Sequence, residues 1–99
     1  MSTSYIIQIF LPFSPDTQPR FDGVRAELTD RFGGVTFYRN SPAEGLWKDD
    51  GKVERDIMVV AEVMVETVDD AWWRSYRLGL ERHFEQDEIV VRALETRRL

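Results

Sequence analysis

Three polar residues interrupt apolar runs of the chain at positions from which they could form one chemical site. Gln8 lies in YIIQIFL, Glu62 in MVVAEVMVE and Arg92 in EIVVRAL. Each run is typical of a strand, in which successive residues point to opposite faces of the sheet. Each polar residue therefore lies on the face opposite its immediate neighbours. If the three strands are adjacent, an amide, a carboxylate and a guanidinium line up on one face.

This set of side chains suits two kinds of role. A carboxylate in an apolar cavity is a stronger base than one in water, so Glu62 could take a proton from carbon or from a phenol. Arg92 could anchor a substrate carboxylate or stabilise an oxyanion, with Gln8 orienting the substrate. Such a site would serve an isomerase, a decarboxylase or a cofactor-independent oxygenase. The alternative is a structural ion pair between Glu62 and Arg92 that fixes the register of a dimer or lies exposed at a sheet edge.

The rest of the chain supplies the elements that must position these side chains. Apolar residues recur at three- and four-residue steps in two stretches, which predicts two helices. Gly33-Gly34 ends the first helix, Asp69 or Asp70 caps the second, and Asp49-Asp50-Gly51-Lys52 is typical of a hairpin turn. The predicted elements are a strand 5–11, a helix 18–32, a strand from Val35, a strand 53–66, a helix 70–86 and a strand 88–94.

The order of these elements is β-α-β-β-α-β, the split βαβ or ferredoxin-like arrangement. We therefore predict a single α+β domain over residues 1–99, with two helices on one face of a four-stranded antiparallel sheet. In the spatial order 4-1-3-2, the first strand lies between the fourth and the third. That order would place Gln8 between Arg92 and Glu62.

The face of this sheet that the helices leave uncovered is too apolar to remain open to water on a monomer. The commonest cover for the topology is a second copy, with two sheets packed face to face as a dimeric α+β barrel. We therefore expect a homodimer and a small-molecule ligand in the cavity between the sheets. The apolar residues of the uncovered face are Ile6, Phe10, Val60, Met64, Val90, Leu94 and Tyr38.

Two aromatic residues join the predicted ligand-binding set. Tyr38 shares the uncovered face, and Trp47 lies near the predicted hairpin, after the irregular segment SPAEG. A tryptophan on a hairpin can close over a ligand, or it can pack on a partner subunit, where tryptophan is enriched. The predicted ligand-binding residues are Gln8, Tyr38, Trp47, Glu62 and Arg92, with Glu62 and Arg92 as the candidate catalytic pair.

Composition excludes several function classes. The 99 residues include no cysteine, so thiolate chemistry and cysteine-based metal sites are excluded. The apolar run near the first residue is too short for a signal peptide or a membrane span, which predicts a cytoplasmic protein without membrane contact. A net charge of −5 disfavours nucleic acid as a partner. Glu62 on the sheet face further disfavours a single-stranded RNA binder of this topology.

The segments FGGVTFYRNSPAEGLWKDDG and DDAWWRSYRLGLERHF, with Gln86 and the strand 89–92, resemble a group of uncharacterised small bacterial proteins. This resemblance covers most of the chain and implies no activity. The topology resembles that of the dimeric α+β barrel proteins, which include monooxygenases, muconolactone isomerases, haem-degrading enzymes and stress-response proteins. Some of those barrels bind haem through one histidine, and His83 is the only histidine here. A lone histidine without partners at ligand spacing favours a structural role, so we predict no metal and no cofactor.

Overall fold

The computed structural model describes residues 3–39, 47–49, 52–54 and 57–99, with β3 and β4 described by their backbone. In chain order the elements are β1 (Thr3–Phe13), a 3-10 turn η1 (Pro15–Thr17), α1 (Gln18–Phe32), β2 (Thr36–Tyr38), β3 (Trp47–Asp49), β4 (Lys52–Glu54), β5 (Ile57–Val65), α2 (Asp70–His83) and β6 (Val91–Arg97).

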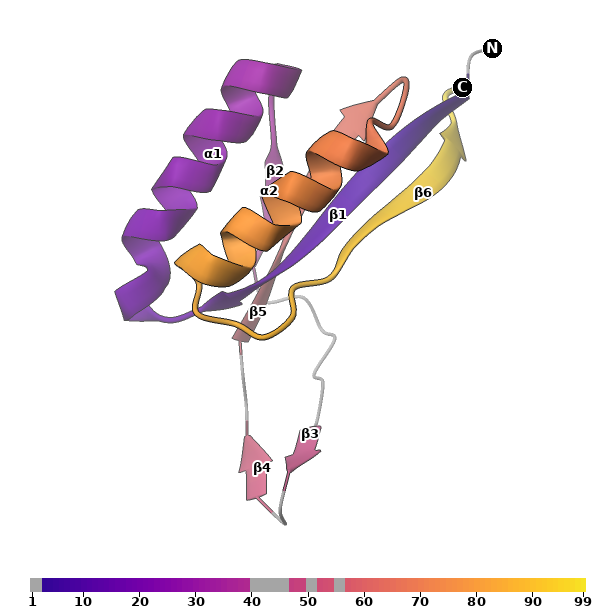
Figure 1. Cartoon of the computed structure of the whole chain (residues 1–99). Helices are drawn as coiled ribbons and strands as arrows, with labels where there is room; N and C mark the ends of the chain where they lie inside the picture. Colours follow the sequence, from indigo (N-terminus) through magenta and orange to yellow (C-terminus); the bar gives the residue numbers. More distant parts are fainter. Residues whose placement is uncertain (1–2, 40–46, 50–51, 55–56) are drawn as a thin grey trace.

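Four of the strands form one antiparallel sheet in the order β2-β5-β1-β6. Both helices lie on the same side of this sheet, as Figure 1 shows. The predicted α+β fold, with its ferredoxin-like element order and its spatial order 4-1-3-2, is confirmed. β3 and β4 pair with each other in a separate two-stranded sheet, with Asp49 opposite Lys52, which confirms the predicted hairpin.

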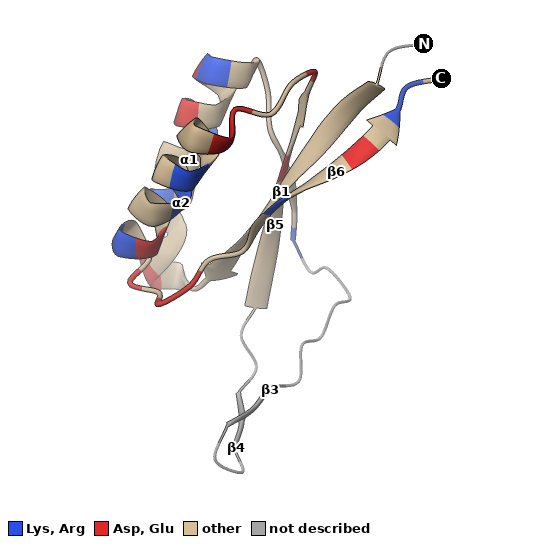
Figure 2. Ribbon diagram, turned by 45° about the vertical axis from the view of Figure 1, so that its right-hand side comes forward, with Lys and Arg blue, Asp and Glu red and all other residues tan. Residues whose placement is uncertain are grey.

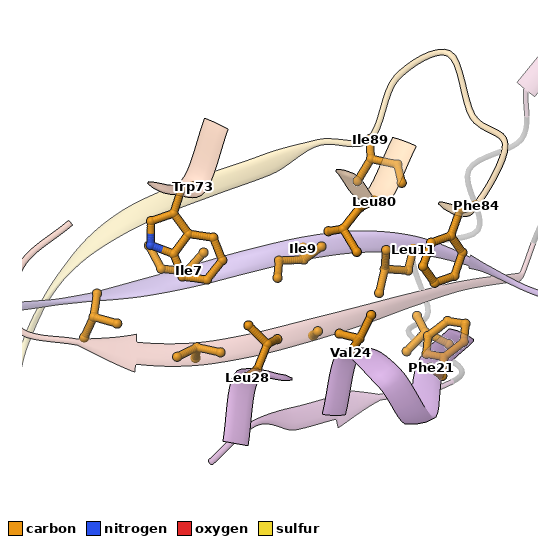
Figure 3. Close-up of a cluster of buried hydrophobic side chains, with 14 residues drawn as sticks. Ile7, Ile9, Leu11, Phe21, Val24, Leu28, Trp73, Leu80, Phe84 and Ile89 are labelled. Carbon is orange, nitrogen blue, oxygen red and sulfur yellow. The ribbon is translucent and has the colours of Figure 1, made fainter. Parts of the chain in front are cut away.

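The hydrophobic core lies between the sheet and the two helices (Figure 3). Alternate residues of β1 and β5 point into it, as the period of two requires. The helices contribute residues at three- and four-residue steps, because these positions share one helical face. The buried apolar residues include Ile7, Ile9, Leu11, Phe21, Val24, Leu28, Val59, Ala61, Val63, Trp73, Leu80, Phe84 and Ile89.

Both predicted helix signals act as expected. Gly33 adopts a left-handed conformation with φ of 86°, which glycine tolerates, and its N–H donates to the carbonyl of Thr29 at 2.8 Å. The carboxylate of Asp69 accepts a hydrogen bond from the N–H of Trp72 at 3.1 Å and so caps α2.

The two helices run in opposite directions across the sheet. Phe21 near the start of α1 contacts Phe84 just after α2, with ring centroids 5.5 Å apart. Phe32 at the end of α1 stacks on Trp73 near the start of α2, with centroids 5.1 Å apart. Each end of one helix therefore lies beside the opposite end of the other.

The predicted strand 53–66 is wrong as a continuous element. Its first residues belong to β4, which pairs with β3, whereas β5 of the main sheet begins at Ile57; residues 55–56 lie outside the described ones. The pattern could not reveal this division, because both parts have strand-like composition.

The predicted ends of α2 and β6 are also wrong. α2 ends at His83 because Glu85 has a positive φ of 53°, so residues 84–86 form a turn instead of helix. The N–H of Ile89 donates to the Glu81 carboxylate at 2.9 Å, outside any strand ladder. β6 then begins at Val91 and continues to Arg97, beyond the predicted limit, because residues 95–97 pair with the first residues of β1.

Candidate functional site

The strand register places the three predicted polar residues in one row. Gln8 on β1 lies directly opposite Glu62 on β5 and directly opposite Arg92 on β6. Thr36 on β2 lies opposite Glu62 and extends the row to the fourth strand. This row, Thr36–Glu62–Gln8–Arg92, lies on the face of the sheet that the helices do not cover, and we call that face the open face. The expected alignment of Gln8, Glu62 and Arg92 on one face of the sheet is therefore confirmed.

Two hydrogen bonds connect the row through the Gln8 amide. The amide Nε2 donates to Glu62 Oε1 at 2.8 Å, and Arg92 Nε donates to the amide Oε1 at 2.7 Å. An ionised carboxylate only accepts hydrogen bonds and a guanidinium only donates them. The two charged neighbours therefore fix the orientation of the amide, since the flipped amide would lose both bonds.

Within one protomer, no direct ion pair between Glu62 and Arg92 is recorded among the described residues. They lie on strands separated by β1, which puts their backbones about 10 Å apart at the usual strand spacing. Among the described residues the only recorded ion pair joins Arg77 and Glu81 on α2, at 3.2 Å. Gln8 instead relays the interaction between the carboxylate and the guanidinium.

Each charged end of the row keeps unused hydrogen-bonding groups. Within the described part of the chain, Arg92 uses only its Nε, which leaves the Nη groups without a protein acceptor. Glu62 uses Oε1, and its second oxygen has no recorded donor there. Arg92 is exposed, whereas Gln8 and Glu62 are half-buried. The row could therefore accept one group of a ligand at each end.

The residues flanking the row are mostly apolar. The guanidinium of Arg92 lies over the ring of Phe10, 5.0 Å from its centroid, in a cation–π contact. The pairs Phe10–Val60 and Ile6–Met64 continue the open face on either side of the row. Figure 2 shows that charged positions are few on β1 and β5 and many on the two helices.

The remaining predicted site residues have different outcomes. Tyr38 is on the open face, but it lies opposite Val60, in the row next to the polar one. Trp47 is in β3, and its side chain and the segment SPAEG lie outside the described residues. Sequence reasoning placed Phe10 on the uncovered face without including it in the ligand-binding set, and it did not include Thr36 in the row. Thr36 is two residues from Tyr38, and Phe10 is two residues from Gln8, so the period of two predicts that each pair shares a face. Only the strand register shows which row across the sheet each residue joins.

This geometry can bind a ligand that is partly apolar and carries an anionic group. Arg92 would receive the anion with its Nη groups, and Phe10 would support the apolar body. Glu62 is placed to accept a proton or a hydrogen bond from the other end of the same molecule. Among the residues that the structure describes, no group of three or more histidine, aspartate or glutamate side chains is placed to hold a metal ion. His83 is exposed on α2, on the helix side of the sheet.

Comparisons of the chain with family models, with curated proteins and with solved structures found no match. Within the described ranges, no helix has both the length and the apolar character needed to cross a membrane.

Proposed function

We propose that this protein binds a small, partly apolar anion on the open face of its sheet, and that a second copy covers this face to complete the site. The hydrogen-bonded chain Glu62–Gln8–Arg92, set among apolar residues, is the observation that supports the proposal. A charged row on an apolar surface is costly to bury unless each group has a partner. The Gln8 amide partners both charges and leaves outward-facing groups to a ligand.

The same arrangement suits a cofactor-independent enzyme. A ligand whose carboxylate is held at Arg92 would present its far end toward Glu62, about 10 Å away across β1. Glu62 would then act as the general base that removes a proton from the bound molecule. Binding and catalysis thus depend on different ends of the row, and substitutions can separate them.

Native mass spectrometry followed by a titration tests the binding proposal. The mass of a retained molecule would identify the ligand, and benzoate serves as a minimal probe with benzyl alcohol as its neutral counterpart. We expect Arg92→Gln to weaken benzoate binding about tenfold or more, since a charge-assisted bond contributes about 1.5–3 kcal/mol. Arg97→Gln, on the same strand but on the other face, is the matched control.

Glu62→Gln distinguishes a protein that only binds the ligand from an enzyme that acts on it. In an enzyme it should abolish turnover of the identified ligand with little change in binding, whereas Glu95→Gln on β6 should change neither. Equal binding of benzoate and benzyl alcohol, or unchanged binding in Arg92→Gln, would reject the open-face site.

A second candidate function is a purely structural homodimer, and the exposure of the open face favours it. Met64 is 52 % exposed, Val90 48 % and Leu94 40 % on this face. Such a concentration of exposed apolar side chains is typical of an interaction surface. Leu94→Arg should convert a dimer to a monomer in analytical ultracentrifugation, whereas Leu78→Arg, at a leucine that is 49 % exposed on α2, should not. A wild-type monomer at high concentration would reject both the dimer and the covered site.

A further inference from the structure

A hollow of about 330 Å³ lies between α1 and α2. Both helices cover the face of the sheet opposite the open face (Figure 1). The residues that line the hollow come only from α1, α2 and the residue that follows α2. Its volume lies at the lower end of the range for small-molecule sites. The lining residues are Arg20, Gly23, Val24, Glu27, Ser75, Tyr76, Gly79, Leu80, His83 and Phe84.

The charged groups of this hollow are separated along its length. Because the helices are antiparallel, Arg20 on α1 lies at the same end as His83 on α2, next to the contact between Phe21 and Phe84. Glu27 lies about 10 Å further along α1, seven residues at about 1.5 Å each. One end therefore offers a guanidinium and a ring N–H, and the other end offers a carboxylate.

Two glycines keep the middle of the hollow open. Gly23 on α1 and Gly79 on α2 both line it, and a Cβ added at either position would meet nothing within 4 Å. Glycine in a helix interior costs about 0.5–1 kcal/mol relative to alanine. Neither position has a positive φ, so neither backbone conformation requires glycine. The two glycines destabilise the helices and leave space between them.

One further polar group lies at the Glu27 end of the hollow. The hydroxyl of Tyr76 is shielded from solvent, lies beside the Glu27 carboxylate, and forms no hydrogen bond of standard geometry with the described residues. Burial first, and then the nearby Glu27 carboxylate, raise the pKa of the Tyr76 phenol well above its ordinary value. The phenol therefore keeps its proton, and the negative charge at this end resides on Glu27.

We propose that the hollow between α1 and α2 binds a small zwitterionic molecule, with its anionic group at Arg20 and His83 and its cationic group at Glu27. The charges match a ligand whose two ionic groups are about 10 Å apart, and Val24 and Leu80 contact the apolar chain between them. Tyr76 would accept a hydrogen bond from the cationic group. This site is independent of the one on the open face.

A titration monitored by backbone amide chemical shifts tests this site, with 8-aminooctanoate as the probe. We expect saturable shifts at Gly23, Ser75 and Gly79. Octanoate and octylamine each lack one of the two charges and should bind about tenfold more weakly, the factor that one modest ionic contact supplies. Equal binding of octanoate, or shifts confined to the open face, would overturn the proposal.

Two substitutions with matched controls complete the test. Gly79→Leu places a side chain in the empty middle of the hollow and should abolish binding, whereas Ala26→Leu, on an exposed position of α1 outside it, should not. Glu27→Gln should reduce the affinity for 8-aminooctanoate to that for octanoate, whereas Asp30→Asn should leave it unchanged. Unchanged binding in a folded Gly79→Leu protein would overturn the proposal. If that variant does not fold by circular dichroism, unchanged binding in Glu27→Gln overturns it.

Discussion

The two faces of the four-stranded sheet are built from the same strands, but the helices shield one face from solvent and leave the other exposed. On β5, Val63 points toward the helices and is 2 % exposed, while its neighbour Met64 points to the open face and is 52 % exposed. The covered face carries no charged residue where β1 and β5 pair, whereas the open face carries charges joined by an amide. The face that the helices cover is lined by apolar side chains, and the face that they leave uncovered holds charged groups in a hydrogen-bonded row.

The largest expected difference between the faces is in stability. Ile9→Ala removes a fully buried side chain and should lower the free energy of unfolding by about 2–4 kcal/mol, because it leaves a cavity in the core. Met64→Ala should lower it by less than about 1 kcal/mol in dilute monomer, since that side chain is half in water. Urea denaturation measures both. A loss as large for Met64→Ala would mean that the open face is already covered under those conditions.

A smaller effect is expected from the centre of the polar row. Gln8→Leu removes both hydrogen bonds that join Glu62 and Arg92 and should cost about 1 kcal/mol, since each partner is still partly hydrated. Thr36→Val, in the same row but without a recorded bond in the described residues, should be nearly neutral. Chemical denaturation of both variants measures the change in the free energy of unfolding. A Gln8→Leu protein as stable as wild type would show that the row contributes nothing to folding and would leave ligand binding as its role.

The smallest effect is expected between the helices. Tyr76→Phe removes a buried hydroxyl that forms no hydrogen bond of standard geometry with the described residues, and it should change the free energy of unfolding at neutral pH by less than about 1 kcal/mol. Because the folded pKa is raised, the protonated phenol favours the folded state. This contribution is intact below the unfolded pKa, about 10, and is lost as the pH rises above it.

Denaturation between about pH 9 and 11 should therefore show a steeper loss of stability for wild type than for Tyr76→Phe. Tyr38→Phe, at a tyrosine that is 48 % exposed, is the control and should behave as wild type does. The same alkaline loss in Tyr76→Phe would show that burial of this phenol is not its cause.

Much of the fold could be predicted from the sequence, because its signals are local. Periodicity located both helices, and Gly33 and Asp69 marked the end of one and the start of the other. The element order then predicted the strand order, which placed Gln8 between Glu62 and Arg92. The period of two predicted which residues of each strand share a face. The apolar residues of each strand then fixed which set faces the core, because a one-residue slip in register would expose them.

The parts that sequence reasoning missed depend on tertiary partners. Residues 95–97 of β6 are polar, and only their pairing with β1 shows that they belong to a strand. Glu81 bonds both Arg77 and the N–H of Ile89, and this contact ties the connection after α2 to the helix. The hollow between the helices was not predicted either, since it requires knowing that Gly23 and Gly79 line the same space.

The central position of β1 has a consequence for how the chain reaches this structure. Gln8 finds one partner 54 positions away and the other 84 positions away, so the sheet forms through contacts that are remote in sequence. Such a topology folds slowly, because long loops must close before the strands gain their pairing energy. During synthesis, the run YIIQIFL cannot gain its second neighbour until residues 91–97 have emerged. Until then one edge of this apolar strand stays unpaired, and such an edge promotes aggregation, so the rate of translation and access to chaperones would affect the yield of folded protein.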